Sequence, residues 1–237
     1  MNRIDLQFKS LREKNQKALV TYLVAGDPDL NETINLMHLC VDSGSHMLEI
    51  GVPFTDPIAE GPIIQKAHDR SLKNKTSFID ILETVKEFRN KDNKTPIILM
   101  GYLNTFISKK DVLNEIDKFG VDGILVVDVP GELNLNNYGL TNNNINAISL
   151  ISPTTNTRRV ELVAKNSSGF VYYVTLRGVT GSSNLDADEI RRNIAEIKKY
   201  TNLPVLAGFG IKTMDDAKKM SKGSDGVVIG SSIVEMI

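Results

Sequence analysis

Short apolar runs rich in β-branched residues alternate with helix-like segments along the whole 237-residue chain. The runs show no regular alternation of polar and apolar residues, which is typical of parallel strands covered on both faces. We therefore predict eight strands, over residues 18–24, 47–52, 96–100, 124–129, 147–151, 170–174, 204–207 and 226–229. The chain length suits one large α/β domain.

The segments between these runs carry apolar residues at helical spacing. Such patterns cover residues 78–88, 112–119 and 190–197. Thr76 or Ser77 can cap the first of these helices, and Gly120 would end the second. The pattern alone is compatible with a doubly wound sheet or a closed barrel, but eight strands within this length favour the barrel. We predict a single (β/α)8 TIM-barrel domain over residues 1–237.

Two places interrupt the repeat. The segment from Asn134 to Asn146 is rich in Asn and contains Gly139, both poor residues for a helix interior. We therefore expect a loop or a frayed helix there. Only Gly230 and the segment SSIVEMI, which ends at Ile237, follow the eighth strand, so the closing C-terminal helix is expected to be short or absent.

The charge balance argues against several classes of partner. A net charge of -1 gives no reason to expect nucleic acid or an anionic membrane surface. No apolar stretch approaches the roughly 20 residues of a membrane helix, and Met1 to Lys17 lack the apolar core of a signal peptide. The single cysteine, Cys40, reads as a packing thiol and suits a reducing compartment. We expect a cytoplasmic protein.

An acid lies inside the second strand. Glu49 stands between Leu48 and Ile50, where a carboxylate must either face the barrel mouth or be held in a structural ion pair. Desolvation would raise its pKa and suit it to general acid–base chemistry. The following segment, PFTDPIAEGP, contains prolines and Gly61 and so predicts a loop; it carries Asp56 and Glu60.

Glycines follow the last three strands. The sequences RGVTGSS, AGFGIKT and IGSSI come after the sixth, seventh and eighth strands. Each glycine alone is ordinary in a turn, but the loops after the late strands of a barrel, together with a helix N-terminus, often bind phosphate through backbone N–H groups. The clustering favours a phosphate site. The histidines His38, His46 and His68 show no metal-binding spacing, and we treat them as structural or surface residues.

These motifs together resemble the tryptophan synthase α family. The resemblance runs over nearly the whole chain, from Gly26-Asp27-Pro28 through LEIGVPFTDPIAEGPIIQ to RGVTG, AGFGI and VIGSSIV in the expected order. It implies a (β/α)8-barrel lyase of tryptophan biosynthesis that splits indole-3-glycerol phosphate into indole and glyceraldehyde 3-phosphate by a retro-aldol reaction.

The resemblance also implies roles for individual residues. Glu49 would be the general acid–base group, and Glu60 would accept a hydrogen bond from the indole N–H as positive charge develops. Thr180 would meet this second acid when its loop closes, and Tyr172 would lie beside Glu49. The remaining matches are the phosphate cradle of Gly181, Gly210, Gly230 and Ser231 and the indole pocket of Tyr22, Met100, Tyr102 and Val127.

The family implies no metal or organic cofactor in this chain. It implies a partner, the pyridoxal-phosphate β subunit, in an α2β2 complex against which the loop from Phe54 to Ile58 would lie. Glu60 departs from the family, which normally has Asp at this position. An alternative is therefore a weakly active or inactive barrel that binds and activates the β subunit. Another phosphate-binding barrel enzyme, such as an isomerase or epimerase, is disfavoured by Glu49 and the loop after it.

Overall fold

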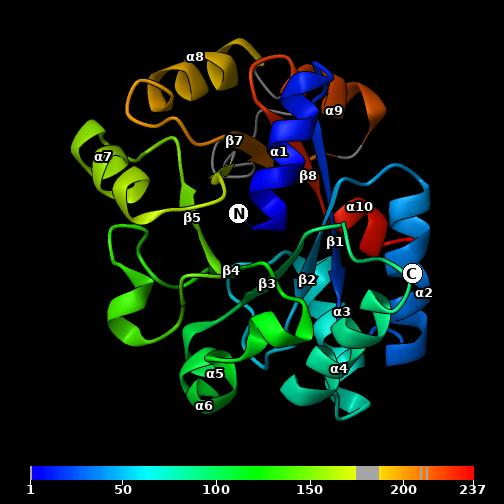
Figure 1. The fold of residues 1–237 in the computed structure, drawn as a ribbon. Helices are drawn as coiled ribbons and strands as arrows, with labels where there is room; N and C mark the ends of the chain where they lie inside the picture. Colours follow the sequence, from blue (N-terminus) through cyan, green and yellow to red (C-terminus); the bar gives the residue numbers. More distant parts are fainter. Residues whose placement is uncertain (1, 175–186, 209, 212) are drawn as a thin grey trace.

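The computed structural model describes residues 2–174, 187–208, 210–211 and 213–237. Eight parallel strands pair in sequence order, and β8 pairs with β1, so the sheet closes into a barrel (Figure 1). The strands are β1 Ala18–Val24, β2 Met47–Gly51, β3 Ile97–Gly101, β4 Gly123–Val126, β5 Asn146–Ile151, β6 Val171–Val174, β7 Val205–Gly208 and β8 Gly226–Ile229. The predicted (β/α)8 barrel is confirmed.

Helices surround the barrel and connect successive strands. They are α1 Arg3–Glu13, α2 Leu30–Asp42, α3 Pro62–Lys73, α4 Phe78–Arg89, α5 Leu103–Ile107, α6 Lys110–Leu113, the 3-10 helices η1 Ile116–Phe119 and η2 Leu135–Tyr138, α7 Thr157–Asn166, α8 Ala187–Ile197, α9 Met214–Ser221 and α10 Ser231–Val234. Ser77 caps α4 as predicted, with its side chain accepting the Asp80 N–H. Four residues of α10 follow β8, which agrees with the expected short helix.

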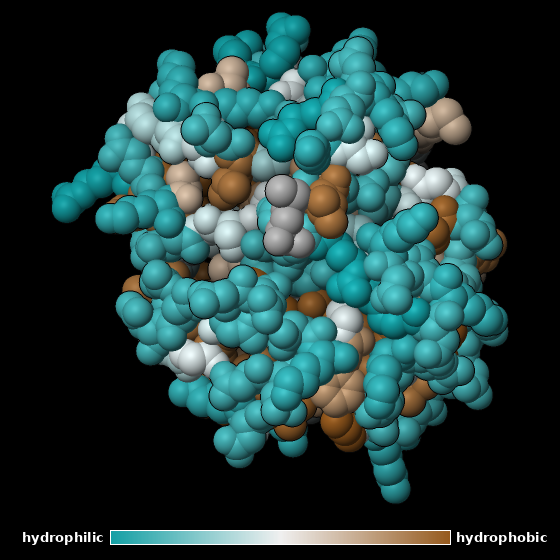
Figure 2. Space-filling model, in the orientation of Figure 1, coloured by the Kyte–Doolittle hydropathy of each residue, from teal (hydrophilic) through white to brown (hydrophobic). Residues whose placement is uncertain are grey.

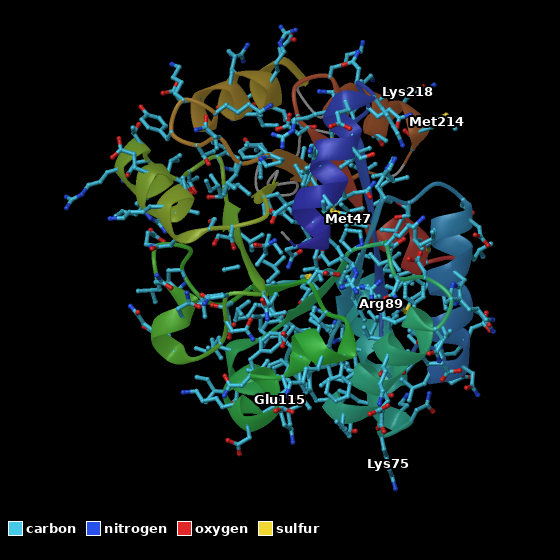
Figure 3. The ribbon with its side chains drawn as sticks, viewed as in Figure 1. Met47, Lys75, Arg89, Glu115, Met214 and Lys218 are labelled. Atoms are coloured by element: carbon cyan, nitrogen blue, oxygen red, sulfur yellow. The ribbon has the colours of Figure 1, made fainter. Side chains whose placement is uncertain are left out.

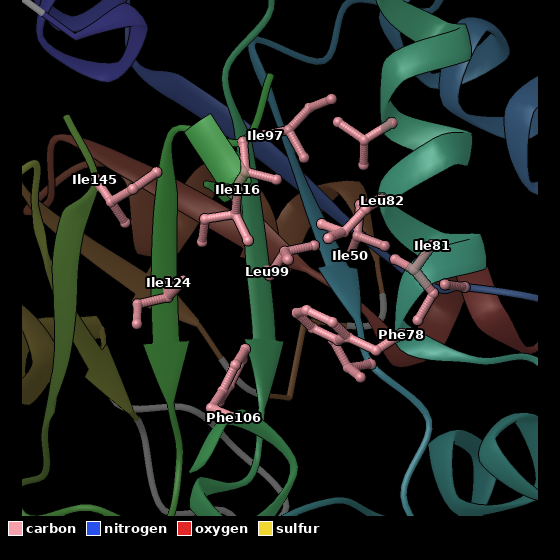
Figure 4. Close-up of a cluster of buried hydrophobic side chains, with 14 of the residues drawn as sticks. Ile50, Phe78, Ile81, Leu82, Ile97, Leu99, Phe106, Ile116, Ile124 and Ile145 are labelled. Carbon is pink, nitrogen blue, oxygen red and sulfur yellow. The ribbon is translucent and has the colours of Figure 1, made fainter. Parts of the chain in front are cut away.

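Apolar side chains form one layer inside the barrel and another between barrel and helices. The inner layer includes Val20, Ile98 and Leu206, and the α1 residues Ile4 and Phe8 pack beneath it. Thus α1, which the sequence patterns did not predict, closes the N-terminal end of the barrel (Figure 1). The outer layer is well seen in Figure 4, where Leu82 of α4 lies near Ile50 of β2 and Leu99 of β3. Because every strand is covered on both faces, its residues are apolar on both sides.

The structure corrects two details of the sequence prediction. The helix expected over 112–119 is divided into α6 and η1, with the break at Asn114, a residue of low helix propensity; Gly120 ends η1 in the left-handed conformation as expected. The strand expected to reach Val129 ends at Val126, where the chain turns and the Val129 N–H donates to the Val126 carbonyl at 3.4 Å. The Asn-rich segment contains the single short helix η2, ended by Gly139.

A buried ion network lies at the N-terminal end of the barrel. Asp122, just before β4, accepts hydrogen bonds from Arg3 and Arg89 at 3.0 Å and from the Ile97 N–H at 2.9 Å. Arg89 lies within the body of the molecule, whereas Lys75 projects into solvent (Figure 3). The network of Asp122 with Arg3 and Arg89 joins α1, α4 and the barrel and is therefore structural.

The face seen in Figure 2 is mainly hydrophilic, with apolar residues in small separate groups.

Candidate active site

Glu49 points into the C-terminal mouth of the barrel from the middle of β2. It is 2% exposed, and its Oε2 has no hydrogen-bond partner among the described residues. Burial, and secondarily the nearby Glu60, raise its pKa to about 8. A buried carboxyl with neither counter-ion nor full hydrogen bonding favours its protonated form. Glu49 is therefore positioned to give up a proton near neutral pH.

The loop over residues 52–61 brings a second acid to the same place. It turns at Pro57, whose carbonyl accepts the Glu60 N–H at 3.1 Å, and it ends where Pro62 begins α3. The Glu60 carboxylate accepts a hydrogen bond from the Tyr102 hydroxyl, which itself accepts the Ala59 N–H at 3.0 Å. Burial raises the pKa of Glu60 to about 7, against the opposing effect of the Tyr102 bond.

Two further tyrosines face the acids. Tyr22 on β1 lies in register with Glu49, and Tyr172 comes from β6. Burial raises the pKa of both hydroxyls well above the usual value, and the negative charge of Glu49 adds to the rise in each. Both therefore remain protonated and able to donate.

These side chains line one cavity of about 230 Å³ at the barrel mouth. The predicted site residues that line it are Tyr22, Glu49, Glu60, Met100, Tyr172, Gly210, Gly230 and Ser231. Residues that the sequence reasoning did not single out complete the wall: Gly61, Pro62, Ile63, Ile64, Ile211 and Val228. Nothing in their apolar character separates them from core residues in the sequence, so only the fold places them here.

Residues of the loops after β7 and β8 meet at this cavity. Gly210 has a left-handed φ of 76°, a conformation in which a side chain would be strained. Gly230 is the N-cap of α10, and Ser231 is the first residue of that helix. The Ser232 hydroxyl donates to the Ile211 carbonyl at 2.7 Å and so joins the loops after β7 and β8. The arrangement provides backbone N–H groups beside the two acids.

Two predicted site residues are placed differently. Tyr102 reaches the cavity through its bond to Glu60, although it does not itself line the cavity. Val127 lines a separate hollow together with Leu150 and Val174. Thr180 and Gly181 lie outside the described residues.

In the described ranges, no three His, Cys, Asp or Glu side chains gather into a set that could hold a metal ion. No helix of the described chain is both long and apolar enough to cross a membrane.

A closed (β/α)8 barrel with two buried acids at its C-terminal mouth defines an enzyme of the acid–base class, because barrel enzymes build their sites at this end. Residues 8–237 match the family model described as tryptophan synthase alpha chain. The chain belongs to this family, whose members are lyases of tryptophan biosynthesis.

Relatives and solved structures agree with this assignment. The tryptophan synthase alpha chains of Marinobacter nauticus and Neisseria meningitidis are 42% and 44% identical; each alignment covers 100% of this chain and 89% and 91% of the respective relative. The crystal structure of the Legionella pneumophila alpha subunit superposes with a TM-score of 0.88 at 36% identity, over 99% of this chain and 88% of that one. A chain in the Mycobacterium tuberculosis tryptophan synthase structure superposes with a TM-score of 0.87 at 25% identity, over 99% and 91%.

Proposed function

We propose that this chain cleaves indole-3-glycerol phosphate to indole and glyceraldehyde 3-phosphate, with Glu49 as the general acid–base group. The observation that carries the proposal is the buried carboxyl of Glu49 in the cavity, whose Oε2 has no hydrogen-bond partner among the described residues and whose pKa is raised to about 8. General acid–base catalysis is most effective when the pKa of the group lies near the working pH.

The reaction divides into two proton transfers on the same carboxyl. Protonated Glu49 gives its proton to the indole carbon that bears the side chain, and the ring nitrogen becomes cationic. The resulting Glu49 carboxylate then takes the proton from the glycerol hydroxyl next to the ring. The carbon–carbon bond breaks, its electron pair neutralises the ring nitrogen, and indole and the aldehyde are formed. Glu49 ends as it began, protonated.

Glu60 stabilises the cation between these two steps. Its carboxylate lines the same cavity and accepts from Tyr102, which fixes its orientation. An anion held in place before the reaction stabilises developing positive charge without reorganisation. Gly181, Gly210, Gly230 and Ser231 would hold the phosphate, and Thr180 would meet Glu60 when its loop closes.

A β subunit is the proposed partner, and pyridoxal phosphate belongs to that subunit in the α2β2 complex. Ile58 in the loop next to Glu60 is 82% exposed, the largest exposed fraction among the large apolar side chains of the described residues. A partner that covers Ile58 would also hold the loop in place, and closure of such loops completes an active site. The loop thus connects the proposed interface to the second acid.

The test is release of indole from indole-3-glycerol phosphate, with and without a tryptophan synthase β subunit. We expect slow release by the chain alone and faster release with the partner. A chain that stimulates the β reaction but releases no indole would instead support the alternative of an inactive activating barrel. If neither subunit stimulates the reaction of the other, the proposed partnership is contradicted.

A further inference from the structure

His68 in α3 connects the cavity wall to the loop that carries Glu60. The side chain is 1% exposed, and each ring nitrogen faces a different group. Nδ1 lies 3.0 Å from the Phe54 backbone nitrogen, and Nε2 lies 3.4 Å from the Tyr22 hydroxyl oxygen. The sequence indicates only a structural or surface role for His68, and its place beside Tyr22 becomes visible only in the fold.

The surroundings of His68 fix its tautomer. A backbone N–H can only donate, so Nδ1 must offer its lone pair to Phe54. Burial lowers the pKa of His68 to about 4, with Asp69 and Asp27 opposing the change, so the ring is neutral at physiological pH. A neutral imidazole has one N–H, which must then lie on Nε2. Nε2 therefore donates to the Tyr22 oxygen.

This donation decides where the hydroxyl proton of Tyr22 points. The oxygen accepts from His68, and the Tyr22 proton must point away from that side. Gly51 closes another direction, since a Cβ there would lie 2.1 Å from the hydroxyl oxygen. Tyr22 is 3% exposed and lines the cavity, whose interior remains as the open direction. The hydroxyl is thus an oriented donor facing the space beside Glu49.

We propose that Tyr22 donates a hydrogen bond to a hydroxyl oxygen of the substrate's glycerol side chain, and that His68 is the positioning residue that keeps this donor aimed into the cavity. The inference rests on the proposed function, because Glu49 acts on the same side chain of the substrate and Tyr22 is its neighbour in register on β1. The pair would select substrates that carry hydroxyls over substrates with a plain alkyl chain.

Two variants separate the two bonds of His68. In His68→Asn the amide oxygen can replace Nδ1 towards Phe54, but nothing reaches Tyr22. In His68→Gln the amide nitrogen can replace Nε2 towards Tyr22, but the Phe54 N–H loses its acceptor. We expect the Asn variant to lower kcat/KM by about three- to tenfold, as for one neutral hydrogen bond, and the Gln variant to keep more of the parent activity. The reverse order would show that His68 only anchors the loop and would overturn the proposal.

Tyr22→Phe tests the hydroxyl directly. It should lower kcat/KM by about tenfold and leave unchanged the inhibition constant of an analogue in which a propyl chain replaces the glycerol. Added to Tyr22→Phe, His68→Asn should cost little more, since both remove the same bond. Equal loss of affinity for substrate and analogue, or additive losses, would contradict the proposal.

His46→Asn is the matched control. The His46 Nδ1 also accepts a backbone N–H, from Leu19 at 3.0 Å, but at the opposite end of the barrel. This variant should keep the parent kinetics; a loss as large as that of His68→Asn would contradict a specific role for His68. Binding of uncleaved indole-3-glycerol phosphate in a Glu49→Gln background gives the same comparison without turnover. Failure of the proposed function would be seen separately, as a parent chain that releases no indole.

Discussion

Each end of the barrel buries an acid, but the two acids differ in their hydrogen-bond partners. Asp122 at the N-terminal end is 2% exposed and receives bonds from Arg3, Arg89 and the Ile97 N–H. Glu49 at the C-terminal mouth is equally buried, yet one of its oxygens has no partner among the described residues. Burial raises the pKa of both, but hydrogen bonds and two arginines oppose the rise in Asp122, whereas Glu60 adds to it in Glu49.

Under the proposed function, this difference separates an acid that supports the fold from one that would carry out chemistry. An ionised, fully hydrogen-bonded carboxylate holds structural elements together, and the loss of its partners would destabilise the fold. A carboxyl left without partners is a cost to the fold. At the mouth of a barrel such a cost is expected where reactivity is needed.

The largest expected effects come from removing each of these two acids by mutation. Glu49→Gln should lower kcat by about 10²–10⁴-fold, because it removes the ionisable group, and should leave the free energy of unfolding undiminished. Asp122→Ala should lower the free energy of unfolding by about 3–5 kcal/mol, because it leaves Arg89 buried without its counter-ion. Steady-state kinetics and urea denaturation measure both.

The distinction between Glu49 and Asp122 is lost if the two variants change activity and stability in the same way. A Glu49→Gln chain with parent activity would remove Glu49 from the mechanism. An Asp122→Ala chain that is stable but inactive would place chemistry at the wrong end of the barrel.

The sequence predicted the barrel well because its strands are continuous apolar runs. The observed strands begin and end within one residue of the predicted ranges, except at β4, where the chain turns after Val126. The pattern could not reveal α1, whose mixed polar sequence reads as a terminus until Ile4 and Phe8 are seen beneath the barrel. Nor could it foresee that the helix before β4 is divided at Asn114.

The candidate site was predictable only in part. Glu49 was visible as an acid in an apolar strand, and the glycines as clusters after late strands. The family resemblance named Tyr22, Met100 and Ser231, but sequence spacing alone does not show that barrel closure brings them to one cavity. The role of His68 depends on two atomic contacts across α3 and was not foreseen.

A smaller effect is expected at Glu60, which belongs to the mouth but has a partner. Glu60→Ala should lower kcat by about 10²-fold, since the anion that faces the cationic ring is lost. The Glu side chain is long enough to reach Tyr102, so Glu60→Asp should also lower the rate, by around tenfold, as the carboxylate moves on the order of 1 Å. Assays with the β subunit present measure both. A faster Asp variant would show that the loop is not adapted to Glu.

The pH dependence sharpens the contrast between the paired and unpaired acids of the mouth. The proposed mechanism needs Glu60 ionised and Glu49 protonated, with pKa values of about 7 and about 8. We expect kcat/KM to fall about tenfold per pH unit below the first value, as Glu60 gains a proton, and above the second, as Glu49 loses its own. Glu60→Ala should lack the acidic limb; an unchanged acidic limb in that variant would assign it to another group.

The phosphate end of the mouth is expected to show an effect of about tenfold. Gly210→Val should weaken binding of glycerol 3-phosphate by this factor, as the side chain crowds the anion and its hydrogen bonds. Gly139→Val is the control, because Gly139 has a similar φ of 66° and open space around it, away from the cavity. Equal affinity in both variants, measured by calorimetric titration, would remove Gly210 from the phosphate site.

The state of the Glu49 carboxyl in the folded chain can be measured directly. Glutamate labelled with ¹³C at the carboxyl carbon gives one resonance per residue, and Glu49→Gln identifies the resonance of Glu49 by its loss. We expect the Glu49 resonance to titrate with a pKa of about 8, well above the ordinary value of 4.5. Titration at or near the ordinary value would mean that Glu49 is ionised at neutral pH, like a bonded structural acid, and would contradict the central claim.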